Sequence, residues 1–197
     1  MIPLEDGRVV LSIGDVSGKG VGAALIMANL QASLRTTQAM GARLYESASR
    51  INHIVYENTP SEMFITFFML CVDPVRKCIR YVNAGHNPPF LVKNDGRVKT
   101  LSRGGLLFGI SDSVTYEEGE IQLENGDMIL MYTDGVSEAM NSAEEEFGEK
   151  RLAEIASRNR TVPLPELLAL IEERVGHYHG SREYEDDFTL LAVRIAP

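Results

Sequence analysis

At residues 14–20 the chain reads Gly-Asp-Val-Ser-Gly-Lys-Gly, and this stretch does most to decide the fold. The apolar run before it predicts a strand at residues 8–13, and residues 21–32 have the apolar spacing of a helix. The glycines between these elements permit a sharp turn and a close approach of the backbone to a ligand. Asp15 therefore stands at the end of a strand, where its carboxylate either binds Mg²⁺ or Mn²⁺ or caps the helix.

Two further acidic motifs lie beside predicted strands. An apolar strand within residues 126–135 ends in Asp134, and a strand within residues 185–195 follows Asp186 and Asp187. Taken alone, each aspartate is explained as a turn residue, because Asp is favoured in turns beside strands. If the three strands neighbour one another, however, their tips converge. Clustered carboxylates repel, so such a cluster implies a cation between them.

Five sequence blocks follow one another along nearly the whole chain. They read Gly-Asp-Val-Ser-Gly-Lys-Gly at 14–20, Met-Phe-Ile-Thr at 63–66, Asn-Ala-Gly-His-Asn-Pro-Pro at 83–89, Tyr-Thr-Asp-Gly-Val-Ser-Glu at 132–138 and Asp-Asp-Phe-Thr-Leu at 186–190. In this order they resemble the metal-dependent PPM-type (protein phosphatase 2C-like) serine/threonine phosphatases. The resemblance is greatest to the bacterial sporulation and stress-response branch, which regulates sigma factors.

The resemblance implies a fold, a reaction and a set of metal ligands. The fold is of the α+β class, with two antiparallel sheets packed face to face and helices on both outer sides (α-β-β-α). The reaction is hydrolysis of phosphoserine or phosphothreonine on a regulatory protein such as an anti-sigma-factor antagonist. Two ions, Mn²⁺ or Mg²⁺, activate the attacking water. By resemblance, Asp15 bridges the ions, the Val16 carbonyl is the adjacent ligand, and Asp134 and Asp186 bind the second ion, with Asp187 as a weaker candidate.

The chain departs from the family pattern at its N-terminus. Members of the family begin with a strand that carries a Gly-Gly-Asp motif, whereas Met1 falls in the segment that follows this motif. We therefore expect residues 1–197 to form one phosphatase domain that lacks the first family strand and its metal-binding aspartate. The Asp6-Gly7 pair predicts a hairpin turn instead. An alternative function is a catalytically weak regulatory or scaffold domain that binds the partner without efficient turnover.

The spacing of apolar and turn residues also predicts the other elements. Strands are expected at residues 63–72, 79–83, 90–93, 128–133 and 188–195, and helices at residues 44–57, 148–157 and 165–175. Strands joined by hairpin turns, with the helices segregated in pairs, indicate the same α+β class.

Composition narrows the class of protein further. The chain has 197 residues, of which 44% are hydrophobic and 24% charged, as in an average globular domain. A net charge of −9 argues against a nucleic-acid surface. No apolar run approaches the roughly 20 residues that cross a bilayer, and no secretory signal is present, so we expect a cytoplasmic protein without membrane contact. A homodimer or an upstream sensor domain is left open as a further partner.

Four other residues have competing interpretations. The stretch before Gly20 is one residue too short for a P-loop and lacks its Ser or Thr. Lys19 either meets a phosphate at the start of the helix or is solvated, and the two readings are equal. His86 is interpreted as a structural loop residue in preference to a proton donor. His177 and His179 are interpreted as a solvated helix end in preference to metal ligands.

Overall fold

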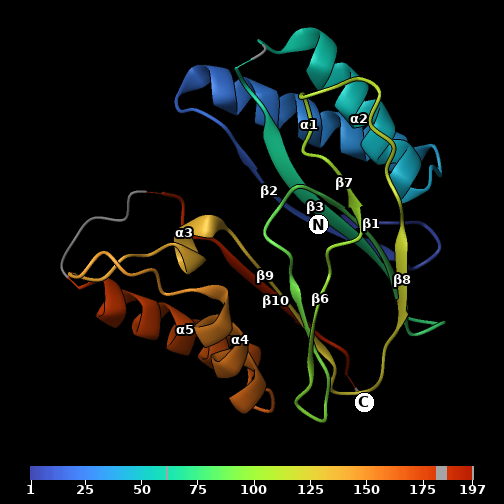
Figure 1. Cartoon of the computed structure of the whole chain (residues 1–197). Coiled ribbons are helices and arrows are strands. Elements are labelled where there is room, and N and C mark those ends of the chain that lie inside the picture. The colour runs from blue at the N-terminus through green and yellow to red at the C-terminus, as the bar shows by residue number, and fades with distance from the viewer. Residues whose placement is uncertain (61, 181–185, 197) are drawn as a thin grey trace. The chain divides into compact units, whose positions relative to one another are not determined.

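The structure is a computed structural model that describes residues 1–60, 62–180 and 186–196 (Figure 1). The described chain divides into two compact units. The first unit comprises residues 1–86 and 102–122, and the second comprises residues 87–101 and 123–197. Each unit contains one sheet with helices packed against it, which confirms the predicted α+β class.

A six-stranded sheet organises the first unit. Its strands are β1 (Ile2–Pro3), β2 (Val9–Val16), β3 (Ile65–Asp73), β4 (Cys78–Ala84), β7 (Gly104–Gly105) and β8 (Gly119–Gln122). The order is β1-β2-β3-β4-β7, with β8 also paired to β4. All pairings are antiparallel except β4 with β7, which is parallel. The predicted turn at Asp6-Gly7 is confirmed: it joins β1 to β2, and Gly7 has a positive φ of 84°.

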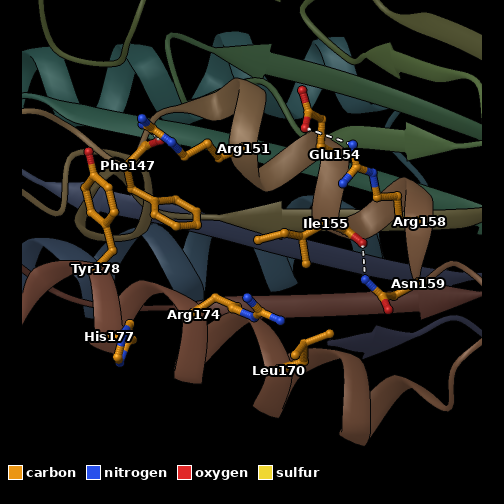
Figure 2. Close-up of a pocket in the computed structure, with 10 residues that line it drawn as sticks. All are labelled: Phe147, Arg151, Glu154, Ile155, Arg158, Asn159, Leu170, Arg174, His177 and Tyr178. Atoms are coloured by element: carbon orange, nitrogen blue, oxygen red, sulfur yellow. Dashed lines mark hydrogen bonds and ion pairs between the residues drawn. The ribbon is translucent and has the colours of Figure 1, made fainter.

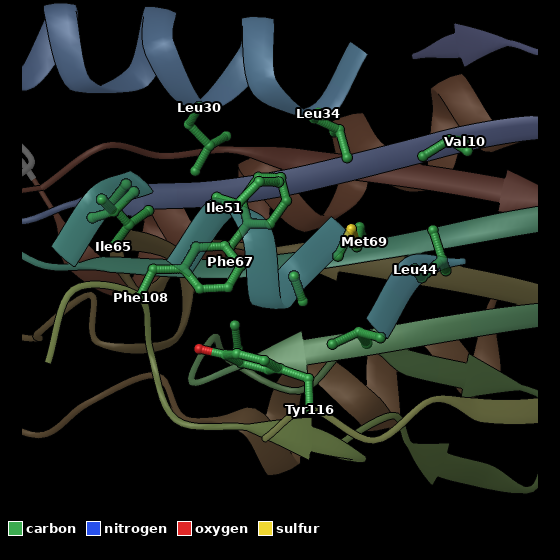
Figure 3. Close-up of a cluster of buried hydrophobic side chains, with 14 of the residues drawn as sticks. Val10, Leu30, Leu34, Leu44, Ile51, Ile65, Phe67, Met69, Phe108 and Tyr116 are labelled. Atoms are coloured by element: carbon green, nitrogen blue, oxygen red, sulfur yellow. The ribbon is translucent and has the colours of Figure 1, made fainter. Parts of the chain in front are cut away.

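Two helices of the first unit lie side by side over this sheet (Figure 1). They are α1 (Val21–Ala39) and α2 (Leu44–Asn58). In α2 the buried positions Leu44, Ala48, Ile51 and Val55 recur at helical spacing and form one apolar face. Together with side chains from α1, β2 and β3, they build the first hydrophobic core (Figure 3). This core fixes the strand β2 that ends at the 14–20 motif.

The second unit is built on a four-stranded antiparallel sheet with the order β10-β9-β5-β6. Its strands are β5 (Phe90–Val92), β6 (Val98–Thr100), β9 (Met128–Tyr132) and β10 (Leu190–Arg194), and its helices are α3 (Asp134–Ser137), α4 (Glu149–Arg158) and α5 (Leu164–His179). All five residues of β9 are buried, and three of them, Met128, Leu130 and Tyr132, join Leu152, Leu167 and Ile171 of the helices in a second core. Because β9 is fully buried and ends at Tyr132, it fixes the position of Asp134, which lies just beyond the end of the strand.

A few sequence-based expectations are refined by the structure. Cys71 and Cys78 are free and buried. The last helix continues beyond Val175 to His179. The interpretation of a solvated end is wrong for His179, which is 7% exposed and donates a hydrogen bond from Nδ1 to the Met140 carbonyl at 2.9 Å. Among the helices of the described chain, none is long and apolar enough to cross a membrane.

One exposed ion pair on α2 leads to a pH prediction. His53 Nδ1 lies 2.8 Å from Asp112 Oδ1, and this hydrogen bond, helped by Glu57, raises the pKa of His53. A pKa raised by folding stabilises the protein fully below the unfolded value of about 6.5, and the effect is lost as pH rises through the folded value. We therefore expect Asp112→Ala to lower Tm more at about pH 6 than at about pH 8.5. A Tm difference that stayed constant or widened with pH would contradict this assignment.

Candidate functional site

The 14–20 motif forms one end of the first sheet. Asp15 is the second-last residue of β2 and pairs with Thr66 of β3. The following loop is anchored to β3 because the Ser17 N–H donates to the Phe64 carbonyl at 2.9 Å, while the Phe64 N–H donates to Ser17 Oγ at 2.8 Å. Gly20 then begins α1 with a φ of 86°, a left-handed conformation that favours glycine. Strand pairing with Thr66 therefore holds Asp15 itself, and the hydrogen bonds between Ser17 and Phe64 hold the loop that follows it.

Glycine is also required one residue before Asp15. A Cβ on Gly14 would lie 2.4 Å from the ring of Phe67 and 2.8 Å from the Thr66 carbonyl. Any larger residue at position 14 would force β2 and β3 apart next to Asp15. The motif thus combines close strand packing with a carboxylate at the strand end.

Two more of the five sequence blocks, at residues 63–66 and 83–89, lie at the end of the sheet that carries Asp15. The Thr66 hydroxyl lies 3.0 Å from His86 Nδ1. The Asn83 side chain closes the His86 loop, since its amide donates to the His86 carbonyl at 2.9 Å and its own carbonyl accepts from the His86 N–H at 2.8 Å. His86 is only 4% exposed. These contacts support the structural interpretation of His86, and they explain why blocks 14–20, 63–66 and 83–89 occur together.

The second unit carries an acidic pair at the end of β9. Asp134 is the first residue of α3 and is half-buried, and its Oδ1 accepts a hydrogen bond from the Gly135 N–H at 2.9 Å. Burial raises the pKa of Asp134, and the nearby carboxylates of Asp186 and, more weakly, Asp187 raise it further. The carboxylates of Asp134 and Asp186 therefore repel each other within one unit.

Thr133 holds the two acidic segments together. Its hydroxyl donates to the Asp187 carbonyl at 2.6 Å and accepts from the Thr189 N–H at 2.9 Å. Gly135 permits the close approach, because a Cβ there would lie 2.6 Å from the Asp187 carbonyl oxygen. Thr133 is 3% exposed, so its hydroxyl is shielded from water. The side chain of Thr133 thus holds the acidic segment at residues 186–187 against the end of β9.

Glu138 is an acidic residue of this site that the sequence analysis did not single out. Partial desolvation raises the pKa of its carboxyl, and Asp134, Glu146 and Asp186 raise it further. Its N–H donates to the Asp134 carbonyl at 2.7 Å across the single turn of α3. The available signal was the spacing of four residues between Asp134 and Glu138, which places both on one helical face.

The chemistry of this donor set fits a divalent cation. Carboxylates that repel one another, here the half-buried Asp134 and the exposed Asp186, are stabilised by a hard cation with oxygen ligands, such as Mg²⁺ or Mn²⁺. Within the described residues, however, no group of three or more His, Cys, Asp or Glu side chains is assembled into a metal site. Asp15 belongs to the first unit, and Asp134 and Asp186 belong to the second. The meeting of all three therefore stays a prediction.

Solved structures identify the class of fold. The chain superimposes on the crystal structure of the RsbU and RsbW domains of a Mycobacterium tuberculosis protein with a TM-score of 0.81 and 29% identity, covering 96% of this chain and 52% of that one. It matches the PP2C phosphatase domain of SpoIIE from Bacillus subtilis with a TM-score of 0.79 and 23% identity, over 98% of this chain and 56% of that one. The fold is that of a PP2C phosphatase domain.

Sequence comparison identifies the family. The model of the family described as Stage II sporulation protein E (SpoIIE) matches residues 5–196, and the chain belongs to this family. Phosphoserine phosphatase RsbU of Bacillus subtilis is 30% identical over 93% of this chain and 55% of its own length. Protein IcfG of Synechocystis is 29% identical over 96% of this chain and 34% of its own length. The chain thus spans between a third and about half of these relatives.

Proposed function

We propose that the chain hydrolyses phosphoserine or phosphothreonine on a regulatory protein in a reaction that depends on divalent metal ions. The observation that carries this proposal is the repelling pair of Asp134 and Asp186, held at the end of β9 in a chain of the SpoIIE family. The relatives RsbU and RsbP of Bacillus subtilis are named phosphoserine phosphatases, which favours turnover over a scaffold that only binds. Family membership and the acidic site support the same reaction.

The proposed metal ligands are the carboxylates of Asp15, Asp134 and Asp186 and the main-chain carbonyl of Val16. Asp187 is a weaker candidate, because its carboxylate raises the pKa of Asp134 less than the carboxylate of Asp186 does. Bound divalent ions supply Lewis-acid catalysis and lower the pKa of a coordinated water. The protein's part is to hold the acidic groups in place: Thr133 fixes the 186–187 loop, and the Ser17–Phe64 hydrogen bonds fix the loop after Asp15. Mn²⁺ and Mg²⁺ both suit this set of oxygen donors.

The proposed substrate is a small phosphorylated regulator of the anti-sigma-factor antagonist class. This proposal rests on the relatives RsbU and RsbP and on the solved structure that contains RsbU and RsbW domains. Because the chain spans only part of its relatives, an upstream sensor domain or a homodimer remains part of the proposal as a source of regulation. No nucleic-acid partner is proposed, since the chain carries a net charge of −9.

Phosphate release tests the proposed function. The purified chain is incubated with a phosphoserine peptide and with an aryl phosphate, in Mn²⁺, in Mg²⁺ and in EDTA, and free phosphate is measured. We expect release with either metal and a loss of at least ~100-fold in EDTA, because the proposed reaction depends on the Lewis-acid chemistry that bound divalent ions would supply. Equal rates in metal and in EDTA would refute the proposed metal-dependent reaction. Stoichiometric binding of a phosphorylated regulator without any phosphate release would favour the scaffold function.

Thr133 provides a test of how the site is held. Thr133→Val keeps the shape but removes the hydroxyl that bridges Asp187 and Thr189, so we expect Mn²⁺ affinity to fall about 10-fold, as for other residues that orient ligands. The loss of buried hydrogen bonds should also lower Tm. Thr133→Ser retains the hydroxyl and should restore the affinity. Calorimetric titration with Mn²⁺ measures both variants, and unchanged affinity in Thr133→Val would show that the hydroxyl does not position the site.

A further inference from the structure

A groove separates α4 from α5 in the second unit, and the acidic site does not use it (Figure 2). Its cavity has a volume of about 570 Å³. On α4 it is lined by Arg151, Ile155 and Arg158, which are spaced by four and three residues and so share one helical face. On α5 it is lined by Leu170 and Arg174, again four residues apart. The groove is therefore lined by one face of α4 and one face of α5, and each face carries both an apolar side chain and an arginine.

The side chains around this groove are predominantly basic. Arg151, Arg158 and Arg174 line it together with a single acidic residue, Glu154. Arg158 lies 3.6 Å from Glu154, but the two side chains are 78% and 50% exposed, so this ion pair is weak. In the described part of the chain, the Arg174 guanidinium takes part in none of the hydrogen bonds or ion pairs. A local excess of positive charge is notable in a chain with a net charge of −9.

One end of the groove is rigidly built. Arg151 donates from one guanidinium nitrogen to the carbonyls of Glu146 and Phe147 at 2.9 and 2.7 Å. Its guanidinium also lies 4.9 Å from the centre of the Tyr178 ring, and this ring packs edge-on against Phe147 at 5.4 Å. The positive charge of Arg151 is thus fixed over an aromatic floor. The groove is preorganised at this end, which lowers the entropic cost of binding.

The arrangement of charge distinguishes between two kinds of acidic ligand. A phosphate group requires several donors that converge on one point. Here the Arg151 guanidinium is already turned onto main-chain carbonyls, and Arg158 lies seven residues, or about 10 Å, further along α4. The partly exposed Ile155 and Leu170 place apolar surface between the charges. Spread positive charge along an apolar groove between two helices complements an acidic amphipathic segment.

We propose that the α4–α5 groove is a docking site for an acidic amphipathic segment of a partner protein. The apolar side chains of that segment would lie on Ile155 and Leu170, and its carboxylates would face the arginines. Recognition of this kind fixes the partner by charge at the rim and by apolar contact at the floor. The proposal does not depend on the phosphatase reaction, because every group that carries it lies on α4, on α5 or at Phe147.

Fluorescence anisotropy tests this proposal. The probe is a labelled 16-residue peptide, in which Leu recurs every three or four residues and Glu fills most other positions. We expect saturable binding in EDTA, where no metal-dependent reaction occurs, and weaker binding at higher salt. Arg174→Glu should weaken binding at least ~10-fold, because it reverses a charge on the rim of the groove. The matched control is Arg76→Glu, which reverses an exposed charge in the first unit and should change little.

Two further measurements show whether a variant loses binding only because it fails to fold. Arg174 is exposed, so Arg174→Glu should keep the Tm and the phosphatase activity of the unaltered chain. Leu170→Glu should weaken binding independently by removing apolar contact. The proposal is overturned if the peptide fails to saturate, if a scrambled peptide of the same composition binds equally well, or if Arg174→Glu and Arg76→Glu behave alike. Tighter binding of a phosphoserine peptide that lacks leucines would likewise overturn it and indicate a phosphate site.

Discussion

Asp134→Asn is expected to lower the metal-dependent rate of phosphate release by at least ~100-fold and to weaken Mn²⁺ binding by at least ~10-fold. The substitution removes one negative charge and nearly preserves the shape of the side chain. The fold should persist, because β9 is buried independently of the Asp134 carboxylate. In the absence of metal the variant should be slightly more stable, since the repulsion from Asp186 is relieved.

Asp95→Asn serves as the matched control for Asp134→Asn. Asp95 is an exposed aspartate of the same unit, and its contacts are with Arg97 in the turn between β5 and β6. This control should keep the wild-type rate and Mn²⁺ affinity. If Asp134→Asn also bound Mn²⁺ with the wild-type affinity in calorimetry, Asp134 would not be a metal ligand.

Asp127→Ala is expected to destabilise the protein by about 3–5 kcal/mol, which is the usual cost of leaving a buried charge without its partner. Asp127 is fully buried, and its carboxylate accepts hydrogen bonds from Lys93 Nζ at 2.5 Å, from the Glu124 N–H at 2.8 Å and from the Asn94 N–H at 3.0 Å. Burial lowers the pKa of Lys93, but the hydrogen bond to Asp127 and the negative charges of Asp127 and Glu124 together outweigh it, and the pKa is raised. One carboxylate thus ties together the turns before β6 and β9.

A second substitution separates the charge effect from the loss of turn contacts. Adding Lys93→Met to Asp127→Ala removes a charge that would be left with only the exposed Glu124 carboxylate, 3.6 Å away, so the double variant should recover part of the lost stability in urea unfolding. The two N–H donors of Asn94 and Glu124 would remain without the carboxylate in both variants. A cost below about 1 kcal/mol for Asp127→Ala, comparable with an exposed ion pair, would contradict the central structural role of this residue.

Long, strongly patterned elements could be predicted from the sequence. The predicted helices at 44–57 and 148–157 match α2 and α4 to within one residue at each end, because their apolar faces repeat at helical spacing. The short elements could not be predicted in this way. Helix α3 is one turn long, and β7 contains only Gly104 and Gly105, so neither has a periodic pattern. Such elements are set by their tertiary partners.

Some residues of the candidate site could likewise be predicted from the sequence, and others could not. Asp15 and Asp134 were predicted at strand ends because an apolar run stops one residue before each of them, at Gly14 and Thr133, and the structure places both at such ends. The role of Thr133 could not be predicted, since its hydroxyl bridges residues more than 50 positions away. The burial of His179 was also missed, because it depends on the distant Met140 carbonyl. Long-range contacts of single side chains leave no local pattern.

We propose that Asp15, Asp134 and Asp186 hold a divalent metal ion together. The most direct measurement is a crystal structure of the chain in Mn²⁺ with anomalous diffraction data. The account predicts an anomalous peak with carboxylate oxygens of all three aspartates in its immediate surroundings, at roughly 2–2.5 Å for direct ligands, as for hard cations bound by oxygen. A Mn²⁺ peak away from these residues, or Asp15 more than about 10 Å from the Asp134 carboxylate, would contradict it.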